Sequence, residues 1–270
     1  KYGFGASRTM QIAQRLYQGI DIEGETIGLI TYMRTDGTNI SKEAINVFRD
    51  YIENNYGKDY LPDEANNYSG KKAKNAQEAH EAIRPTDFSR NKHSGTADEE
   101  KLYGLIWRRA IASQMADAKL EKTTAKIDIS TSSENFIAKG EMLVFEGFLK
   151  VYLESTDDEN LDEQDGILPP LKVGETLSLE NIIATEKFTH HPPRYTEASL
   201  VKKLETLGIG RPSTYAPTIS TIQKRGYVVK EDRDGHERDF NTLTLENGTI
   251  NDVTSKENYS VERKKMFPTD

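Results

Sequence analysis

Residues 29–36 read Leu29-Ile30-Thr31-Tyr32-Met33-Arg34-Thr35-Asp36, a short apolar run that ends in charged residues. Its composition favours a strand or another extended segment over residues 27–33. In an extended segment residues i and i+2 point to the same face, so Tyr32 and Arg34 would project side by side. A phenol beside a guanidinium suits attack on a phosphodiester, because the guanidinium can hold the phosphate and stabilise the transition state. The alternative is that Tyr32 is a strand tyrosine and Arg34 a surface charge.

A tyrosine nucleophile needs help from its surroundings. The free phenol has a pKa near 10, so ionising it at pH 7 costs about 4 kcal/mol. A cation, a base or a metal can lower that cost. Arg34 is the nearest cation in the sequence, since no other lysine or arginine lies within six residues of Tyr32.

Three blocks of the sequence resemble type IA DNA topoisomerases. YMRTD at 32–36 looks like the active-site signature of that family, and AQEAHEAIRPT at 76–86 is similar to a second block. The third is PPRYTEASLVKKLE at 192–205, which continues as GIGRPSTYA at 208–216. The resemblance extends from the N-terminus to about residue 230. Met33 resembles the bacterial topoisomerase I branch, whereas Gly37 departs from the serine that usually follows the aspartate.

The resemblance implies an enzyme that relaxes negatively supercoiled DNA without ATP. Tyr32 would attack one strand, form a 5′-phosphotyrosine and release a 3′-hydroxyl, the other strand would pass, and the hydroxyl would attack back. Its DNA partner would be single-stranded segments of negatively supercoiled duplex. The cofactor would be Mg²⁺, bound mainly by a domain absent from this chain. A monomer in the cytoplasm is expected.

The resemblance also implies an α+β multidomain fold that forms part of a toroidal enzyme. We expect a mainly helical tyrosine domain at 1–120, a β-rich arch domain at 121–185 and a winged-helix-like DNA-binding domain at 186–270, which would be truncated. The chain begins at Lys1 and ends without a helix stop signal, so we expect a segment of a longer protein that has little or no activity alone.

The resemblance assigns catalytic roles to Tyr32, Arg34 and His80. A histidine in the second block would lie near the DNA phosphate as a hydrogen-bond donor or proton relay, and the pKa range of histidine suits either role. The alternative is a helix-face histidine bonded to the backbone. Arg211 and Thr214 would bind the DNA backbone at a helix N-terminus, where free N–H groups favour anions. The alternative there is that Ser213 or Thr214 is a simple helix cap.

We predict no metal site within the chain. The run at 232–235, Asp-Arg-Asp-Gly, hints at metal ligands. A calcium-binding loop needs several more oxygen ligands, so a turn is the better interpretation. Without cysteine, the chain forms no disulfides and no thiolate zinc sites, which fits a reducing compartment. No apolar run is long enough for a transmembrane helix.

The net charge of −8 is unusual for a DNA-binding protein, but the acidic residues are concentrated in the middle of the chain. Residues 121–185 carry 14 acidic and 5 basic side chains, whereas residues 186–230 carry 3 acidic and 8 basic ones. The blocks expected to contact DNA therefore lie outside the acidic segment.

The spacing of apolar residues and turn signals predicts the elements. Helices are expected at 7–18, 42–55, 98–115, 196–206 and 214–225. Strands are expected at 126–130, 136–138, 143–145, 148–153 and 177–183. A hairpin is expected from 227–230 and 240–245 with its turn at 232–239, and an acidic loop at 155–166. Residues 76–84 fit a helix or a loop.

Two other classes of function remain open on the sequence alone. A noncatalytic winged-helix DNA-binding module would account for the layout of residues 195–245. A structural or protein-interaction segment would account for the acidic middle. Loss of covalent DNA capture on substitution of Tyr32 would distinguish an enzyme from the first, and salt-sensitive single-strand binding would count against the second.

Overall fold

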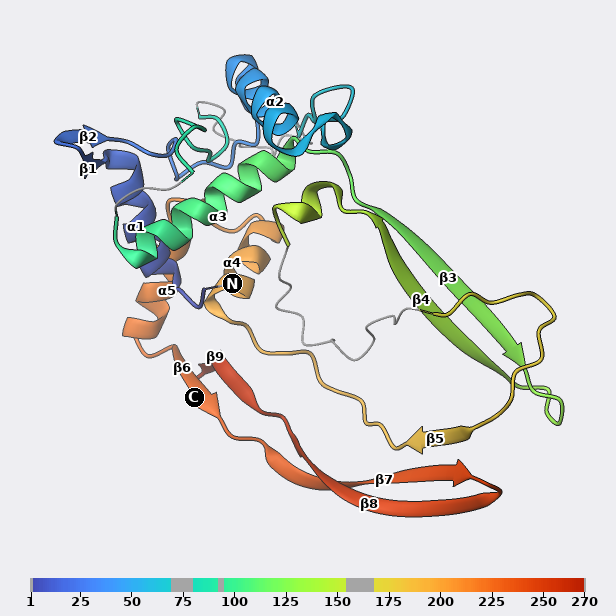
Figure 1. Cartoon of the computed structure of the whole chain (residues 1–270). Coiled ribbons are helices and arrows are strands. Elements are labelled where there is room, and N and C mark those ends of the chain that lie inside the picture. The colour runs from blue at the N-terminus through green and yellow to red at the C-terminus, as the bar shows by residue number, and fades with distance from the viewer. Residues whose placement is uncertain (1, 69–79, 92–94, 154–167, 270) are drawn as a thin grey trace. The chain divides into compact units, whose positions relative to one another are not determined.

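The computed structural model describes residues 2–68, 80–91, 95–153 and 168–269 (Figure 1). The chain divides into two compact units, each with both helices and strands. The first comprises Lys1–Leu168 with Val201–Ser220, and the second comprises Pro169–Leu200 with Thr221–Asp270. This division does not test the three predicted domains, which remain a prediction.

Three helices enclose the hydrophobic core of the first unit: α1 (Ala6–Gln18), α2 (Lys42–Tyr56) and α3 (Ala97–Ser113). All three were expected, with ends within two residues. Fully buried side chains from each helix meet in one cluster, including Leu16, Phe48 and Ile111. Burying a side chain of this size contributes about 1.5–3 kcal/mol.

Side-chain caps fix where two of these helices begin. The Ser41 hydroxyl accepts a hydrogen bond from the Ala44 N–H at the start of α2. At the start of α3, Thr96 and Glu99 form a capping box, in which each side chain accepts from the other residue's backbone N–H. Short 3-10 helices follow at η1 (Lys58–Tyr60) and η2 (Gly147–Lys150).

A strand or another extended segment was expected at 27–33, and the strand alternative is wrong. Strands β1 (Ile20–Ile22) and β2 (Glu25–Ile27) pair as a hairpin before it, and residues 28–36 form only one isolated bridge, between Ile30 and Pro85. Leu29 and Ile30 are consecutive and each is 1% exposed, so burial does not alternate as it does along a half-buried strand.

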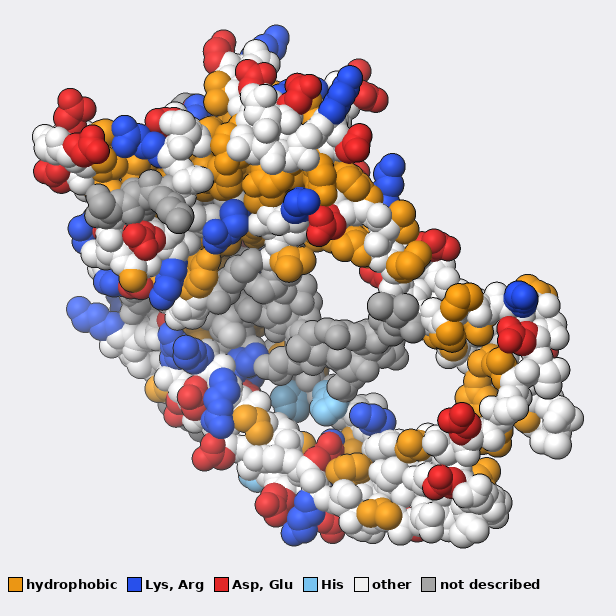
Figure 2. All heavy atoms as spheres, in the orientation of Figure 1, with side chains coloured by type: hydrophobic (Ala, Val, Ile, Leu, Met, Phe, Trp, Pro, Cys, Tyr) orange, Lys and Arg blue, Asp and Glu red, His pale blue; other side chains and the backbone are white. Residues whose placement is uncertain are grey.

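The expected strands at 126–130, 136–138 and 143–145 belong to one long hairpin of β3 (Lys119–Asp128) and β4 (Asn135–Phe145). Figure 2 shows hydrophobic side chains on the surface of this part of the chain. Phe136, Met142 and Val144 of the hairpin are exposed. The expected strand at 148–153 is wrong. Its first residues lie in η2, where a Cβ on Gly147, which has a φ of +49°, would lie 2.5 Å from the Ala116 carbonyl oxygen.

The second unit contains two antiparallel sheets. One has the order β5-β7-β8, from β5 (Asn181–Thr185), β7 (His236–Glu246) and β8 (Thr249–Tyr259). The other pairs β6 (Val228–Arg233) with β9 (Glu262–Pro268). Part of the strand expected at 177–183 is therefore present in β5.

The expected hairpin of 227–230 with 240–245 is wrong, because β6 pairs with β9 and β7 pairs with β8. The true hairpin turn is Asn247-Gly248, with φ of +50° and +75°. This dipeptide suits a tight turn in which both central residues have positive φ. Much of the expected turn at 232–239 is strand, and Asp232 accepts a hydrogen bond from the Lys264 N–H at 2.6 Å.

Helices α4 (Glu197–Thr206) and α5 (Tyr215–Lys224) confirm the two helices expected in the third block. The Thr196 hydroxyl accepts from the Ser199 N–H at the start of α4. The acidic loop at 155–166 and residues 76–79 of the segment 76–84 lie outside the described residues, and residues 80–84 form no helix. No described helix has the length and apolar character needed to cross a membrane.

Candidate active site and DNA-contact segments

The segment that carries Tyr32 is held in place by residues 82–86. The Thr31 hydroxyl donates to the Ala82 carbonyl at 2.7 Å and accepts from the Arg84 N–H at 2.9 Å. The Thr31 N–H donates to the Arg84 carbonyl, and the Thr86 hydroxyl donates to the Gly28 carbonyl at 2.7 Å. Two of the three sequence blocks therefore meet side by side at Tyr32.

The ring of Tyr32 lies between two other rings. Tyr17, from the end of α1, meets it edge-on with centroids 5.3 Å apart, and His80 lies 4.6 Å away, tilted by 47°. Aromatic pairs at these separations attract and fix each other's orientation. The Tyr32 side chain is half-buried and packs against the core. The structure therefore brings the predicted nucleophile and the predicted histidine into contact.

The place of His80 depends on a close backbone approach at Gly37. A Cβ on Gly37 would lie 2.2 Å from the His80 carbonyl oxygen, so a larger residue does not fit this arrangement. The Thr35 hydroxyl accepts from the Gly37 N–H at 2.9 Å and donates to the His80 carbonyl at 3.4 Å. The glycine that departs from the family pattern is thus part of the structure that holds His80.

An ion pair braces the same segment. The Arg84 guanidinium donates to both carboxylate oxygens of Glu81, at 2.9 and 2.8 Å, and to the Pro85 carbonyl. The Arg84 side chain is only 13% exposed. The sequence analysis assigned no role to Arg84. The signal was present, because a glutamate and an arginine three residues apart can pair.

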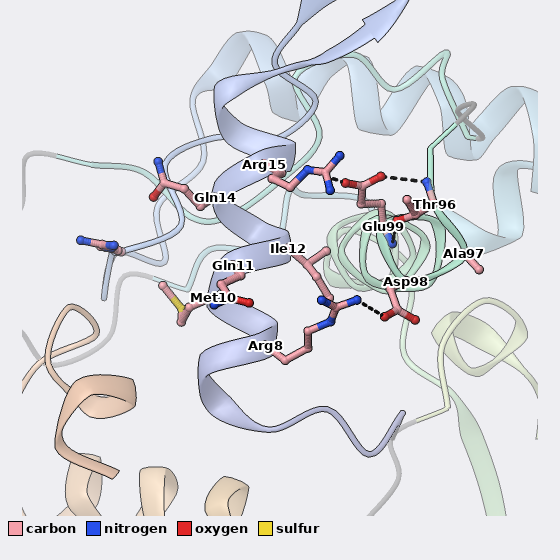
Figure 3. Close-up of a pocket in the computed structure, with 11 residues that line it drawn as sticks. Arg8, Met10, Gln11, Ile12, Gln14, Arg15, Thr96, Ala97, Asp98 and Glu99 are labelled. Atoms are coloured by element: carbon pink, nitrogen blue, oxygen red, sulfur yellow. Dashed lines mark hydrogen bonds and ion pairs between the residues drawn. The ribbon is translucent and has the colours of Figure 1, made fainter. Parts of the chain in front are cut away.

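Arg34 does not share a strand face with Tyr32, because the segment is not a strand. Its exposed side chain lines a cavity of about 710 Å³ between α1 and the start of α3. Figure 3 shows Arg8 and Arg15 reaching from α1 to Asp98 and Glu99 in that cavity, with Gln11 and Gln14 also on α1.

A second cavity, of about 240 Å³, joins Arg34 to the segment that contains the predicted DNA-binding residues. Pro212 and Ser213 line it, together with residues of α1. Burial raises the pKa of the neighbouring Tyr215 phenol, and the nearby carboxylates of Glu205 and Asp36 raise it further. Residues of the GRPST segment and Arg34 of the Tyr32 segment thus line the same cavity.

The predicted DNA-binding residues form a compact turn of their own. The Thr214 hydroxyl accepts from the Arg211 N–H at 2.8 Å and donates to the Arg211 carbonyl at 3.1 Å. The Arg211 guanidinium donates to the Gly210 carbonyl at 2.7 Å. Thr214 is exposed and directly precedes α5, so its backbone lies at the expected helix N-terminus.

The part of the chain that the structure describes holds no cluster of three or more histidine, aspartate or glutamate side chains suited to a metal ion. What the described residues offer chemically is a phenol in contact with an imidazole, and an exposed guanidinium two residues further along the chain.

Comparisons with known proteins show which family the chain belongs to. A family model described as DNA topoisomerase matches residues 1–241. DNA topoisomerase 1 of Rickettsia felis is 52% identical over 237 residues, which cover 86% of this chain and 30% of that protein. DNA topoisomerase 1 of Zymomonas mobilis is 50% identical over 236 residues, 86% of this chain and 19% of that protein.

Among solved structures, full-length topoisomerase I from Thermotoga maritima matches with a TM-score of 0.70 and 36% identity. The match covers 86% of this chain and 36% of that one. The chain thus spans less than a third of the length of the two curated relatives. On the family match over residues 1–241, the chain belongs to the DNA topoisomerase family.

Proposed function

We propose that this chain carries the nucleophile of a DNA topoisomerase I that cuts one DNA strand, lets another strand pass and reseals the cut. The observation that carries the proposal is the contact between the rings of Tyr32 and His80, with Arg34 in the same unit. The enzyme acts on single-stranded segments of negatively supercoiled DNA and changes its topology without ATP.

In the cleavage step, the Tyr32 oxygen attacks the phosphorus and forms a new P–O bond. The bond from phosphorus to the 3′ oxygen breaks, and that oxygen leaves as a hydroxyl after taking a proton. His80 is the proposed relay for the phenol proton, because its ring already contacts the phenol ring. Arg34 stabilises the negative charge that builds up on the phosphate.

Resealing is the reverse reaction. The free 3′-hydroxyl attacks the 5′-phosphotyrosine, the P–O bond to Tyr32 breaks, and the phenol recovers its proton. One phosphodiester is exchanged for another, so no external energy source is needed. The exposed Thr214 and the Arg211 side chain, at the start of α5, hold the DNA backbone while the strand is open.

The remaining assignments extend the same proposal. Residues 1–120, 121–185 and 186–270 act as a tyrosine domain, a β-rich arch and a winged-helix-like DNA-binding domain of a toroidal enzyme. The enzyme works as a cytoplasmic monomer, and magnesium is held mainly by a different domain of the longer protein. The family match and the length of the relatives support these assignments.

The test is covalent capture of DNA by the full-length protein. A single-stranded oligonucleotide labelled at its 3′ end should leave its label on the protein after denaturation, attached at residue 32. Tyr32→Phe should abolish capture, whereas Tyr195→Phe, at an exposed tyrosine of the second unit, should not. Label that remains on the Tyr32→Phe protein would refute the proposal.

Two results would contradict the proposed function or its cleavage polarity. If the wild-type protein binds the oligonucleotide but never captures it, the chain is a noncatalytic DNA-binding module. Transfer of label only from the 5′ end of the oligonucleotide would reverse the proposed polarity. For the 270-residue chain alone, we expect no relaxation of supercoiled plasmid, which a gel assay would check.

A further inference from the structure

A continuous surface runs along one side of α1, from the start of α3 to the start of α5. The two cavities at its ends share Met10, Gln11 and Arg34. Arg8, Gln11 and Arg15 follow a spacing of three and four residues, which places them on one face of the helix. Arg34 thus lies where both cavities meet, beside a row of donors on α1.

The two arginines of α1 are held in place but remain accessible. Arg8 donates to Asp98 at 2.7 Å, and the Arg15 Nε forms an ion pair with Glu99 at 2.9 Å (Figure 3). Their side chains are 58% and 63% exposed. A guanidinium carries five N–H donors in a planar fork, so each arginine can keep its carboxylate and still bind a phosphate.

The two ion pairs have different physical roles. Glu99 is buried, with its side chain 3% exposed, so it needs the charge of Arg15. Asp98 is 29% exposed and Arg8 is 58% exposed, and an exposed pair of this kind contributes little to stability. Folding stability therefore explains the position of Arg15 but not that of Arg8.

We propose that α1 carries the DNA strand beyond the scissile phosphate, with Arg8 and Arg15 binding two of its backbone phosphates. The inference rests on the proposed function and adds a strand path to it. The two arginines are seven residues apart, or about 10 Å along the helix axis, so they can contact different phosphates. Gln11 and Gln14 supply amide groups for the sugar or base edges between them.

The acidic residues at the start of α3 bound the proposed DNA path on one side. Asp98 and Glu99 line the far wall of the cavity and repel phosphates. A strand is therefore kept on the α1 wall of the cavity, where Arg8, Gln11 and Arg15 lie. The same carboxylates fix the arginine side chains before DNA arrives, which lowers the entropy lost on binding.

The test measures binding separately from chemistry. In full-length protein carrying Tyr32→Phe, a fluorescent single-stranded oligonucleotide is titrated at several salt concentrations. Arg8→Gln should weaken binding about 5–10-fold at about 100 mM salt and lower the slope of log affinity against log salt by about 0.7. Asp98→Asn should strengthen binding, because it removes a competing carboxylate, and a merely structural role would not predict that gain.

Arg90→Gln is the matched control, since Arg90 also forms an exposed ion pair, with Asp87, but lies outside both cavities. It should leave affinity and salt slope unchanged. If Arg8→Gln behaves like Arg90→Gln while the wild-type protein still captures DNA at Tyr32, the strand path is wrong and the proposed function stands. If capture at Tyr32 itself fails, the proposed function falls and the path falls with it.

Discussion

The imidazole ring of His80 lies against the phenol ring of Tyr32, with the ring centroids 4.6 Å apart. The two residues are 48 positions apart in the chain, and they meet because residues 82–86 bond to residues 28–31. The Tyr32 side chain is thus positioned by a segment that carries no regular secondary structure.

His80→Ala should slow covalent capture of DNA while leaving binding intact. Loss of a positioned proton relay reduces rates by about 100-fold or more, and loss of the ring contact also frees the phenol. Single-turnover capture of a 3′-labelled oligonucleotide measures the effect. His190→Ala, at an exposed histidine of the second unit, is the control and should react at the wild-type rate. Equal rates for both variants would remove His80 from the mechanism.

Gly37→Ala should displace His80 without touching it chemically. The added Cβ would lie 2.2 Å from the His80 carbonyl, so the segment must shift. Overpacking of this kind costs about 1–3 kcal/mol, and capture should slow at least about 10-fold.

Gly104→Ala is the control. At Gly104 the atom nearest to an added Cβ is the flexible end of Arg108 at 3.3 Å, and alanine at this helical site should increase folding stability by up to about 1 kcal/mol. Thermal unfolding and capture assays distinguish the two, and wild-type capture by Gly37→Ala would contradict the model of the site.

Arg84→Ala should destabilise the segment beside Tyr32 by about 1–3 kcal/mol, because charged hydrogen bonds to Glu81 are lost at a side chain only 13% exposed. In a double-mutant cycle, Glu81→Ala with Arg84→Ala should cost less than the sum of the two single changes. The exposed pair of Lys122 and Glu141 offers a control, with an interaction below about 1 kcal/mol. If the stability losses at residues 81 and 84 are additive, the Glu81–Arg84 ion pair does not stabilise the segment.

The helices could be predicted from the sequence because their signals are local. Apolar spacing and the caps at Ser41 and Thr96 define α2 and α3 within a few residues of chain. The segment at 28–36 gave no such signal. Leu29 and Ile30 are both buried in the core cluster and their backbone bonds to residues 85 and 86, and both features depend on tertiary structure.

Part of the candidate site could be predicted because its signals are also local in the sequence. The identities of Tyr32, Arg34 and His80 follow from motifs, and only the fold brings Tyr17 to Tyr32. A Cβ on Gly28 would lie 2.7 Å from the Tyr17 carbonyl, so this approach needs a glycine. The hairpin of the second unit could be predicted from the sequence, since Asn247-Gly248 is a strong hairpin signal.

Tyr103 gives the first unit a predicted loss of stability at alkaline pH. The side chain is 1% exposed and its hydroxyl donates to the Arg90 carbonyl at 2.5 Å. Burial, and then the Asp87 carboxylate, raise the pKa of this phenol from 10.0 to about 12. Below pH 10 the phenol is neutral in both the folded and the unfolded state, so its full contribution to folding stability is present. Above that, the unfolded chain ionises first, and stability falls as the pH rises towards about 12.

Urea denaturation of the chain, followed by the fluorescence of its single tryptophan, Trp107, measures this loss. At pH 8, Tyr103→Phe should be less stable than wild type by about 1 kcal/mol, the value of one hydrogen bond. The difference in unfolding free energy between the wild type and Tyr103→Phe should narrow between pH 10 and 12. Only the wild type loses stability from this residue there, because phenylalanine cannot ionise. Tyr227→Phe, at a side chain 58% exposed, should follow the wild-type curve throughout. A gap for Tyr103→Phe that stays constant from pH 8 to 11.5 would mean that this phenol does not couple folding to pH.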